Sequence, residues 1–266
     1  MKKITLALFC LSLLLPLFGQ TITCSGSTTV LPIAQATAEA FMDKYPQINV
    51  SVRGGGSGVG IAALQNGTVQ IANSSRKIKS KELSAAKANG IDPRGYAVAN
   101  DGIAIILHPS NKVKALTTAQ IRDIYTGKIK NWQQLGGDKL PIVIISRDVA
   151  SGTFEVFNEK ALGGAKVDPS AQMLASNNAV VSTVADTPGG IAYAGLGYVN
   201  EDVKVLPVNG IMPSMKTVKD GSYPLSRKLY MYTDGKASGN VAAYIGFIQG
   251  PDGQKIVEQN GFIRID

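Results

Sequence analysis

Three short segments of this chain are rich in serine, threonine and glycine, and each lies between a predicted strand and a predicted helix. The first is Ser25-Gly26-Ser27-Thr28-Thr29, and the second is Arg53-Gly54-Gly55-Gly56-Ser57-Gly58. A helix that begins at such a turn leaves its first backbone N–H groups without intrahelical partners. Glycine lets the backbone approach a ligand closely and the hydroxyls add further donors, so each turn predicts a place where an anion could bind.

The third segment, Arg147-Asp148-Val149-Ala150-Ser151-Gly152-Thr153, has the same character and adds a cation. The planar guanidinium of Arg147 can donate two parallel, charge-assisted hydrogen bonds to a tetrahedral oxyanion. A single turn of this kind is more simply interpreted as a helix cap. Three such turns in one chain, one of them with an arginine, favour an oxyanion site.

The elements that must position these turns follow from the alternation of apolar runs with helical patterns, which predicts a parallel α/β architecture. We expect strands at residues 21–25, 48–53, 69–72, 97–107, 142–146, 190–194 and 229–233. We expect helices at residues 31–44, 58–66, 79–89, 118–126, 154–162, 177–185, 237–249 and 253–259. Ligands in open α/β sheets lie beyond the carboxyl ends of the strands, so the three turns would place an anion between two lobes.

The first residues have the order of a secretory signal: Lys2 and Lys3 precede an apolar run at residues 4–18, and small Gly19 follows. We therefore expect a signal peptide at residues 1–19, cleavage near Gln20 and a periplasmic location. The alternative is an uncleaved anchor, although the run is shorter than the ~20 residues that span a bilayer.

Cys10 lies within the predicted signal, so Cys24 remains without a disulfide partner. Residues 21–23 read as the start of a strand and not as the small-residue site that precedes a lipidated cysteine. We expect Cys24 to be a buried free thiol rather than the site of a lipid anchor.

The composition, with 44% hydrophobic and 17% charged residues, excludes a disordered chain. The length permits one large or two smaller domains. The formal charge of +8 falls to about +6 without the two signal lysines, and it could attract an anion or an acidic surface. The basic residues are scattered without interleaved aromatics, which argues against nucleic acid as a partner.

Six segments, taken in order, resemble the phosphate-binding proteins of high-affinity phosphate ABC importers, and they cover almost the whole mature chain. The most specific is Leu116-Thr117-Thr118-Ala119-Gln120-Ile121-Arg122-Asp123-Ile124-Tyr125-Thr126-Gly127-Lys128-Ile129, followed by Trp132. The others are the first turn with Pro32, the second turn, Ser74-Ser75-Arg76, the third turn, and Thr187-Pro188-Gly189-Gly190-Ile191-Ala192-Tyr193.

The resemblance implies a two-lobed periplasmic-binding-protein fold of type II, with the lobes joined by a two-stranded hinge. A long strand with Asp101-Gly102 at its middle and a long loop at residues 209–224 suggest where the chain crosses. We expect lobe 1 at residues 20–100 and 225–266 and lobe 2 at residues 101–224. The implied function is capture of inorganic phosphate by a monomer, without a cofactor, for delivery to the membrane permease subunits of the importer.

The resemblance also implies which residues contact the ligand and which support them. Asp148 would hold the guanidinium of Arg147 rather than contact phosphate. The implied donors are Ser27, Thr28, Thr29, Ser57, Gly58, Arg147, Ser151, Gly152 and Thr153.

One position departs from the family pattern, because Ser75 stands where the best-known members have an aspartate that accepts the proton of hydrogen phosphate. Ser75 can accept that proton through an oxygen lone pair. It lacks the negative charge that repels sulfate, so the usual basis of phosphate selectivity is weaker here. Arg76 is either a second cation in the cleft or a solvated surface residue.

An enzyme is the competing class of function. The single histidine, His108, precedes Pro109 in a predicted loop and forms no recognisable nucleophile arrangement with Ser57 or Ser151. The chain has no Walker-type phosphate loop and too few Cys and His residues for a Cys/His zinc site. A secreted phosphatase that uses carboxylates and magnesium remains an alternative. Two further alternatives remain. The protein could bind sulfate, molybdate or a phosphate ester, or it could have an adhesion or sensory role.

Overall fold

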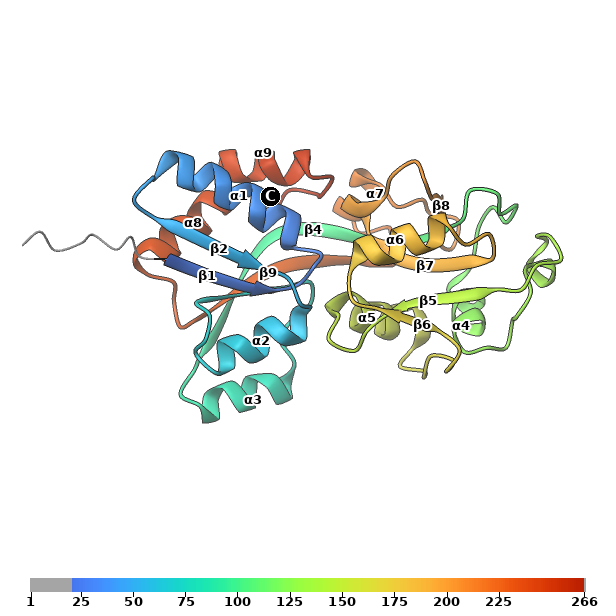
Figure 1. Ribbon diagram of the computed structural model, residues 1–266, viewed down its shortest axis with the longest axis horizontal. Helices are drawn as coiled ribbons and strands as arrows, with labels where there is room; N and C mark the ends of the chain where they lie inside the picture. Colours follow the sequence, from blue (N-terminus) through green and yellow to red (C-terminus); the bar gives the residue numbers. More distant parts are fainter. Residues whose placement is uncertain (1–20, 266) are drawn as a thin grey trace, which may run out of the picture.

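Residues 21–265 of the computed structural model form two α/β lobes that are connected by two long strands (Figure 1). The predicted signal peptide lies outside these described residues. Within residues 21–265 no helix is both long and apolar enough to cross a membrane.

The first lobe is built on three parallel strands in the order β2-β1-β3. These are β1 (Thr21–Gly26), β2 (Asn49–Arg53) and β3 (Ile71–Ser74). Helices α2 (Ser57–Gln65) and α3 (Ser80–Ala88) lie on one side of the sheet (Figure 1). The other side carries α1 (Leu31–Lys44), α8 (Gly239–Gln249) and α9 (Pro251–Gln259).

The second lobe contains the parallel strands β6-β5-β7 and the short strand β8. The strands are β5 (Val143–Arg147), β6 (Gln172–Leu174), β7 (Gly190–Gly195) and β8 (Lys204–Leu206). The helices are α4 (Thr118–Tyr125), α5 (Gly152–Phe157), α6 (Asn177–Ala185) and α7 (Met215–Lys219). Three short helical segments accompany them, η1 (Trp132–Leu135), η2 (Asn158–Leu162) and η3 (Leu196–Tyr198).

The two connecting strands are β4 (Pro93–Leu107) and β9 (Ser226–Asp234). They pair in antiparallel register, in which Asp101 lies opposite Arg227, with a β-bulge between Ala97 and Ala99. Residues 93–102 of β4 lie along β9, and residues 103–107 pair with β7 and, in part, with β8. This pair of strands is the two-stranded hinge that the sequence predicts.

Each lobe has its own hydrophobic core. In the first lobe the rings of Phe41 in α1 and Tyr244 in α8 meet edge to face with centroids 5.3 Å apart, so the C-terminal helices complete a core begun by N-terminal strands. Cys24 is a buried free thiol in this core, as expected, and burial raises its pKa to about 12.

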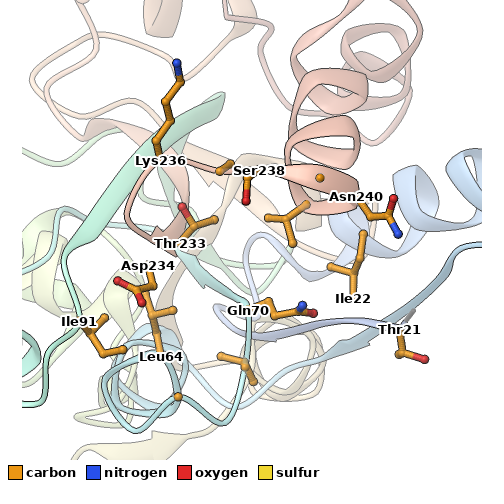
Figure 2. Close-up of a pocket in the computed structure, with 15 residues that line it drawn as sticks. Thr21, Ile22, Leu64, Gln70, Ile91, Thr233, Asp234, Lys236, Ser238 and Asn240 are labelled. Atoms are coloured by element: carbon orange, nitrogen blue, oxygen red, sulfur yellow. The ribbon is translucent and has the colours of Figure 1, made fainter. Parts of the chain in front are cut away.

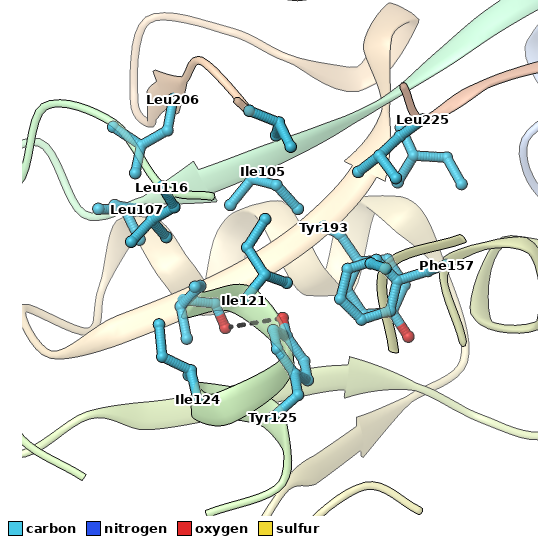
Figure 3. Packing of buried hydrophobic residues seen from close by; sticks show 14 of the residues in the cluster. Ile105, Leu107, Leu116, Ile121, Ile124, Tyr125, Phe157, Tyr193, Leu206 and Leu225 are labelled. Atoms are coloured by element: carbon cyan, nitrogen blue, oxygen red, sulfur yellow. Dashed lines mark hydrogen bonds between the residues drawn. The ribbon is translucent and has the colours of Figure 1, made fainter. Parts of the chain in front are cut away.

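The core of the second lobe is centred on three aromatic rings (Figure 3). Phe157 of α5 stacks on Tyr193 of β7 with ring centroids 3.8 Å apart, and Tyr125 of α4 packs edge-on against Phe157. The buried Tyr125 hydroxyl donates to the backbone oxygen of Ile145 at 3.0 Å. These contacts connect α5, which opens at the third predicted turn, to two strands of the sheet.

The predicted strands and helices are all present, but the prediction of a parallel architecture is wrong in part. The sheet is mixed, because β9 is antiparallel to both β3 and β4, and β4 is antiparallel to β7 and β8. Sequence reasoning also missed the short strands β6 and β8 and the helix α7, which lies in the predicted loop at residues 209–224.

Candidate functional site

The three predicted turns come together where the two lobes face each other. Thr28 of the first turn accepts a hydrogen bond from the guanidinium of Arg147 at 3.1 Å. The hydroxyls of Thr29 and Thr153 lie 2.9 Å apart. The backbone N–H of Gly58 donates to the carbonyl of Ala150 at 3.0 Å. The first and second turns of one lobe therefore both contact the third turn of the other.

The first turn is held by a hydroxyl and by a glycine. The Ser27 hydroxyl oxygen accepts from the backbone N–H groups of Thr29 and Val30, at 3.1 and 3.4 Å, just before α1 begins. Gly26 has a φ of +136°, and a Cβ there would lie 2.2 Å from the carbonyl oxygen of Asn73. The chain can turn this tightly only because residue 26 lacks a side chain.

The second turn places Ser57 beside Ser75, which follows strand β3. The Ser75 backbone N–H donates to the Ser57 hydroxyl oxygen at 3.0 Å, and the two hydroxyl oxygens lie 3.3 Å apart. Gly152 of the opposite lobe lies against both, since a Cβ at residue 152 would come within 2.3 Å of the Ser57 hydroxyl oxygen. Ser75 therefore belongs to the same cluster as the three turns.

The third turn is anchored from within its own lobe. Ser151 caps α5 by accepting from the backbone N–H of Phe154 at 3.2 Å. The backbone N–H of Arg147 donates to the Tyr193 hydroxyl at 3.1 Å, so the aromatic stack in the core also positions this residue. The Arg147 side chain donates to the carbonyls of Leu174 and Ala175 at 3.1 and 2.9 Å.

One donor of Arg147 has no partner among residues 21–265: its Nη1 atom, which is buried. Burial lowers the pKa of this guanidinium, and no carboxylate of residues 21–265 forms an ion pair with it. An arginine nevertheless remains protonated in proteins. A buried, charged donor without a partner is unfavourable, and an anion bound at Nη1 would relieve it.

Asp148 does not hold the guanidinium of Arg147, and that prediction is corrected. Its carboxylate accepts from the backbone N–H of Ala150 at 2.8 Å and shapes the turn. The guanidinium instead donates to backbone carbonyl groups at the end of β6, because the side chain of Arg147 extends toward that strand.

Arg76 is neither a free cation of the cleft nor a surface residue. Its side chain is buried and contacts Glu82 of α3 and Glu155 of α5, at 2.7 and 2.6 Å. Lys79 also contacts Glu155, at 2.8 Å. Glu155 belongs to the second lobe and the other three belong to the first, so this cluster is an ion-pair contact between the lobes.

Sequence reasoning missed a second buried arginine, Arg227, at the centre of the site. Its Nη1 and Nη2 atoms donate to the hydroxyls of Thr153 and Thr29 at 3.0 and 3.3 Å. Asp101, opposite on β4, contacts its Nε and Nη2 atoms at 2.8 and 2.7 Å. Burial raises the pKa of Asp101 and lowers that of Arg227, and the contact between the two charges opposes both shifts.

Asn177, the first residue of α6, was missed as well. Its side-chain N–H₂ group donates to the hydroxyl oxygens of Thr29 and Thr28, at 3.1 and 3.4 Å. Tyr198 completes the set, because its hydroxyl donates to the carbonyl of Thr28. The sequence did contain one signal for Arg227. Asp101 is an acidic residue within an apolar strand, and a buried acid usually has a buried partner of opposite charge.

One hollow on the surface lies away from this cluster, and a second borders it. One, of about 440 Å³, lies between β1, α2 and the start of α8, at the strand ends opposite the turns (Figure 2). Thr21, Gln70, Asp234 and Lys236 line it, and no predicted site residue does. The other, of about 980 Å³, runs along the lobe junction and is lined by Arg76, Glu155, Lys160, Arg227 and Lys228 among others. No group of three or more His, Cys, Asp or Glu side chains within the described part of the chain could hold a metal ion.

Two lobes that meet over a cluster of hydrogen-bond donors, with a two-stranded connection between them, form the architecture of a hinged solute-binding protein. A family model described as the PBP superfamily domain matches residues 19–252. The phosphate-binding protein PstS of Bacillus subtilis is 37% identical over 250 residues, which cover 92% of this chain and 80% of that protein. PstS of Pseudomonas aeruginosa is 30% identical over 263 residues, covering 90% and 81% of the two chains.

Solved structures agree with this assignment. A phosphate ABC transporter substrate-binding protein with bound phosphate from Clostridium perfringens is 34% identical, with a TM-score of 0.87 and coverage of 93% of this chain and 100% of that one. An ABC-type phosphate transport receptor from Vibrio cholerae is 29% identical, with a TM-score of 0.77 and coverage of 92% and 100%. The chain belongs to the PBP superfamily and, within it, to the family of the phosphate-binding protein PstS.

The buried Asp101–Arg227 pair leads to a prediction about stability. Asp101→Asn removes the counter-charge and leaves the guanidinium buried, so we expect a loss of about 3 kcal/mol in the free energy of unfolding. Urea denaturation would measure this loss. Asp92→Asn is the matched control: Asp92, which directly precedes β4, contacts Arg94 in an exposed pair, and its loss should cost less than about 1 kcal/mol. Equal effects of the two substitutions would contradict the assignment of Asp101.

Proposed function

We propose that this protein is an extracytoplasmic solute-binding protein that binds inorganic phosphate between its lobes and delivers it to an ABC importer. The observation that carries the proposal is the buried Nη1 atom of Arg147, which has no partner among residues 21–265 and belongs to a side chain that contacts the hydroxyl of Thr28 in the other lobe. A guanidinium donor in such a position suits a tetrahedral oxyanion. The names of the PstS relatives and the phosphate-bound Clostridium perfringens neighbour support phosphate as that anion.

The proposed ligand contacts are the residues that resemblance implied, together with Ser75. Their convergence from both lobes supports this set, as does the burial of Arg147 and of every serine and threonine in it. It consists of Ser27, Thr28, Thr29, Ser57, Gly58, Ser75, Arg147, Ser151, Gly152 and Thr153.

The lobes would open and close by bending of β4 and β9. We place the boundaries so that residues 20–100 and 225–266 move as one body and residues 101–224 as the other. The division of the cores supports this placement: one cluster draws its buried members from residues 22–99 and 229–262, and the largest cluster draws all but Leu225 and Ile263 from residues 103–223. Closure would remove water from the anion and strengthen its hydrogen bonds.

The proposed cellular setting follows from the same function. The protein would be exported by its signal peptide, act in the periplasm as a monomer and dock on the membrane permease subunits of the importer. It would need no cofactor and catalyse no reaction. The competing proposal of a secreted phosphatase predicts release of phosphate from a chromogenic ester, and an assay without colour development would argue against it.

Titration calorimetry with phosphate, sulfate, arsenate and molybdate tests the proposal, and two variants make the test specific. Arg147→Ala removes a buried, charged donor, so we expect phosphate affinity to fall by at least ~2 kcal/mol, or roughly 30-fold. Lys128→Ala is the control, because its exposed ammonium contacts only Asp123, at 3.2 Å, among the charged residues described. Equal affinities of the two variants would show that the third turn is not part of the site.

Position 75 gives a separate prediction about selectivity. Ser75→Asp places a carboxylate beside Ser57 and Gly152, where it would accept the proton of hydrogen phosphate and repel sulfate. We expect the ratio of phosphate to sulfate affinity to rise, even if phosphate affinity itself falls through charge and crowding. The two affinities, measured in the native protein and in the variant, give this ratio. An unchanged ratio would mean that Ser75 does not face the proton of the ligand.

A further inference from the structure

One carboxylate of the second lobe contacts two cations of the first. The Oε2 atom of Glu155, in α5, lies 2.6 Å from Arg76 Nε and 2.8 Å from Lys79 Nζ. Arg76 and Lys79 belong to the segment between β3 and α3, in the first lobe. Bending of β4 and β9 would therefore separate these two cations from Glu155.

Arg76 is held ready for this contact by its own lobe. Its Nη1 and Nη2 atoms each donate to a carboxylate oxygen of Glu82 at 2.7 Å, and its side chain is only 5% exposed. Glu82 belongs to α3 and moves together with Arg76, so the guanidinium is oriented whether the lobes are together or apart. The entropy lost in ordering this side chain then opposes the folding of the first lobe and not the closure of the two lobes.

The attraction between Arg76 and Glu155 is one of charge rather than of an aligned hydrogen bond. The Nε and Oε2 atoms are buried and close, but neither takes part in a hydrogen bond within residues 21–265. A hydrogen bond weakens steeply with angle, whereas the attraction of two charges falls only inversely with distance. The contact would therefore favour closure while the lobes are still approaching each other.

Glu155 does not assist an anion directly. It follows Thr153 of the third turn by two positions, so its negative charge repels an anion bound at that turn. Loss of this repulsion alone would strengthen anion binding, whereas loss of a contact that holds the lobes together would weaken it. The two effects have opposite signs, and an experiment can separate them.

We propose that Glu155, Arg76 and Lys79 form a charge latch that favours the closed arrangement of the lobes. The charge latch raises the affinity for the anion by increasing the population of the closed form, without contacting the anion itself. It depends on no property of the ligand, so it acts equally on every anion that the site accepts. This inference rests on the proposed function, because it requires an anion that binds between closing lobes.

The first test removes the charge of Glu155 and keeps its shape. Titration calorimetry with phosphate and with arsenate, a second tetrahedral anion, measures the affinities of the native protein and of Glu155→Gln. We expect both affinities to fall by about tenfold and in the same ratio, because a less populated closed form lowers every apparent affinity alike.

Glu159→Gln is the matched control for this variant. Glu159 is exposed, lines the same groove as Glu155 and takes part in no ion pair within residues 21–265. Its loss removes a similar charge near the site but no contact between the lobes, so both affinities should stay within about twofold of the native values.

Lys79→Gln tests the charge latch from the other lobe. The Lys79 side chain is 54% exposed, so its contact is partly screened and we expect a smaller loss of both affinities, about threefold. In the Glu155→Gln background the same substitution should change neither affinity, because its partner charge is already gone. A loss of the same size in both backgrounds would overturn the charge latch, since Lys79 would then act on the anion and not on Glu155.

A comparison with Lys77 decides the matter even if Glu155→Gln does not fold, as judged by circular dichroism. Lys77 is an exposed cation of the same groove and has no ion pair in the described part of the chain. Lys77→Gln therefore removes the same charge as Lys79→Gln but no contact with Glu155. Equal affinities of these two variants would contradict the charge latch.

The outcomes separate this inference from the proposed function. A native protein that binds neither anion would overturn the proposed function. Native binding, with Glu155→Gln binding as tightly as Glu159→Gln or more tightly, would overturn the charge latch alone. So would a loss of affinity for only one of the two anions, because Glu155 would then act on the ligand and not on closure.

Discussion

The site depends on the burial of two guanidinium groups at the junction of the lobes. Removing such a group from water is unfavourable unless acceptors or an opposite charge surround it. Arg227 is neutralised by Asp101 across the hinge strands. Arg147 instead contacts two carbonyls and one hydroxyl, and one of its buried donors has no partner in the described part of the chain. The contrast separates an arginine that organises the site from one whose charge is available to an anion.

The position of Arg147 is determined by the packing of the second lobe. The ring of Tyr193 stacks on Phe157 in the core, and its hydroxyl accepts from the backbone of Arg147. Phe157 also ends the helix that begins at Gly152, so the same aromatic contact supports both ends of the third turn. Close-packed cores yield little when neighbours move, which suits a site that must present several donors at once.

The contact between the lobes also includes the charged side chain of Arg76, which pairs with two acidic residues. Arg76 faces the other lobe, but Glu82 and Glu155 surround its guanidinium, so its charge serves the lobe contact rather than the anion. The hydroxyls of Thr29 and Thr153 meet across the same junction, and Arg227 contacts both from the hinge. Arg227, on a connecting strand, therefore forms hydrogen bonds with both lobes at once, and bending of the hinge would change these hydrogen bonds.

The sequence alone determined the local features of this protein. The turns at residues 25–29, 53–58 and 147–153 follow from strands, helix starts and hydroxyls, and some of their hydrogen bonds join residues only two or three positions apart, such as Ser151 and Phe154. The alternation of elements and the ordered motifs were also sufficient for the α/β class and the two-lobed family. Their signals lie within short stretches of chain.

Only the tertiary structure decided which distant groups meet. Asp101 and Arg227 are 126 positions apart, and Asn177 and Thr29 are 148 apart, so no spacing along the chain connects them. The same is true of the carbonyls of β6 that replace Asp148 as partners of Arg147, and of the acids that neutralise Arg76. Each of these pairings depends on how β4 and β9 place one lobe against the other, because a side chain's charge partner is set by position in space and not by its neighbours in sequence.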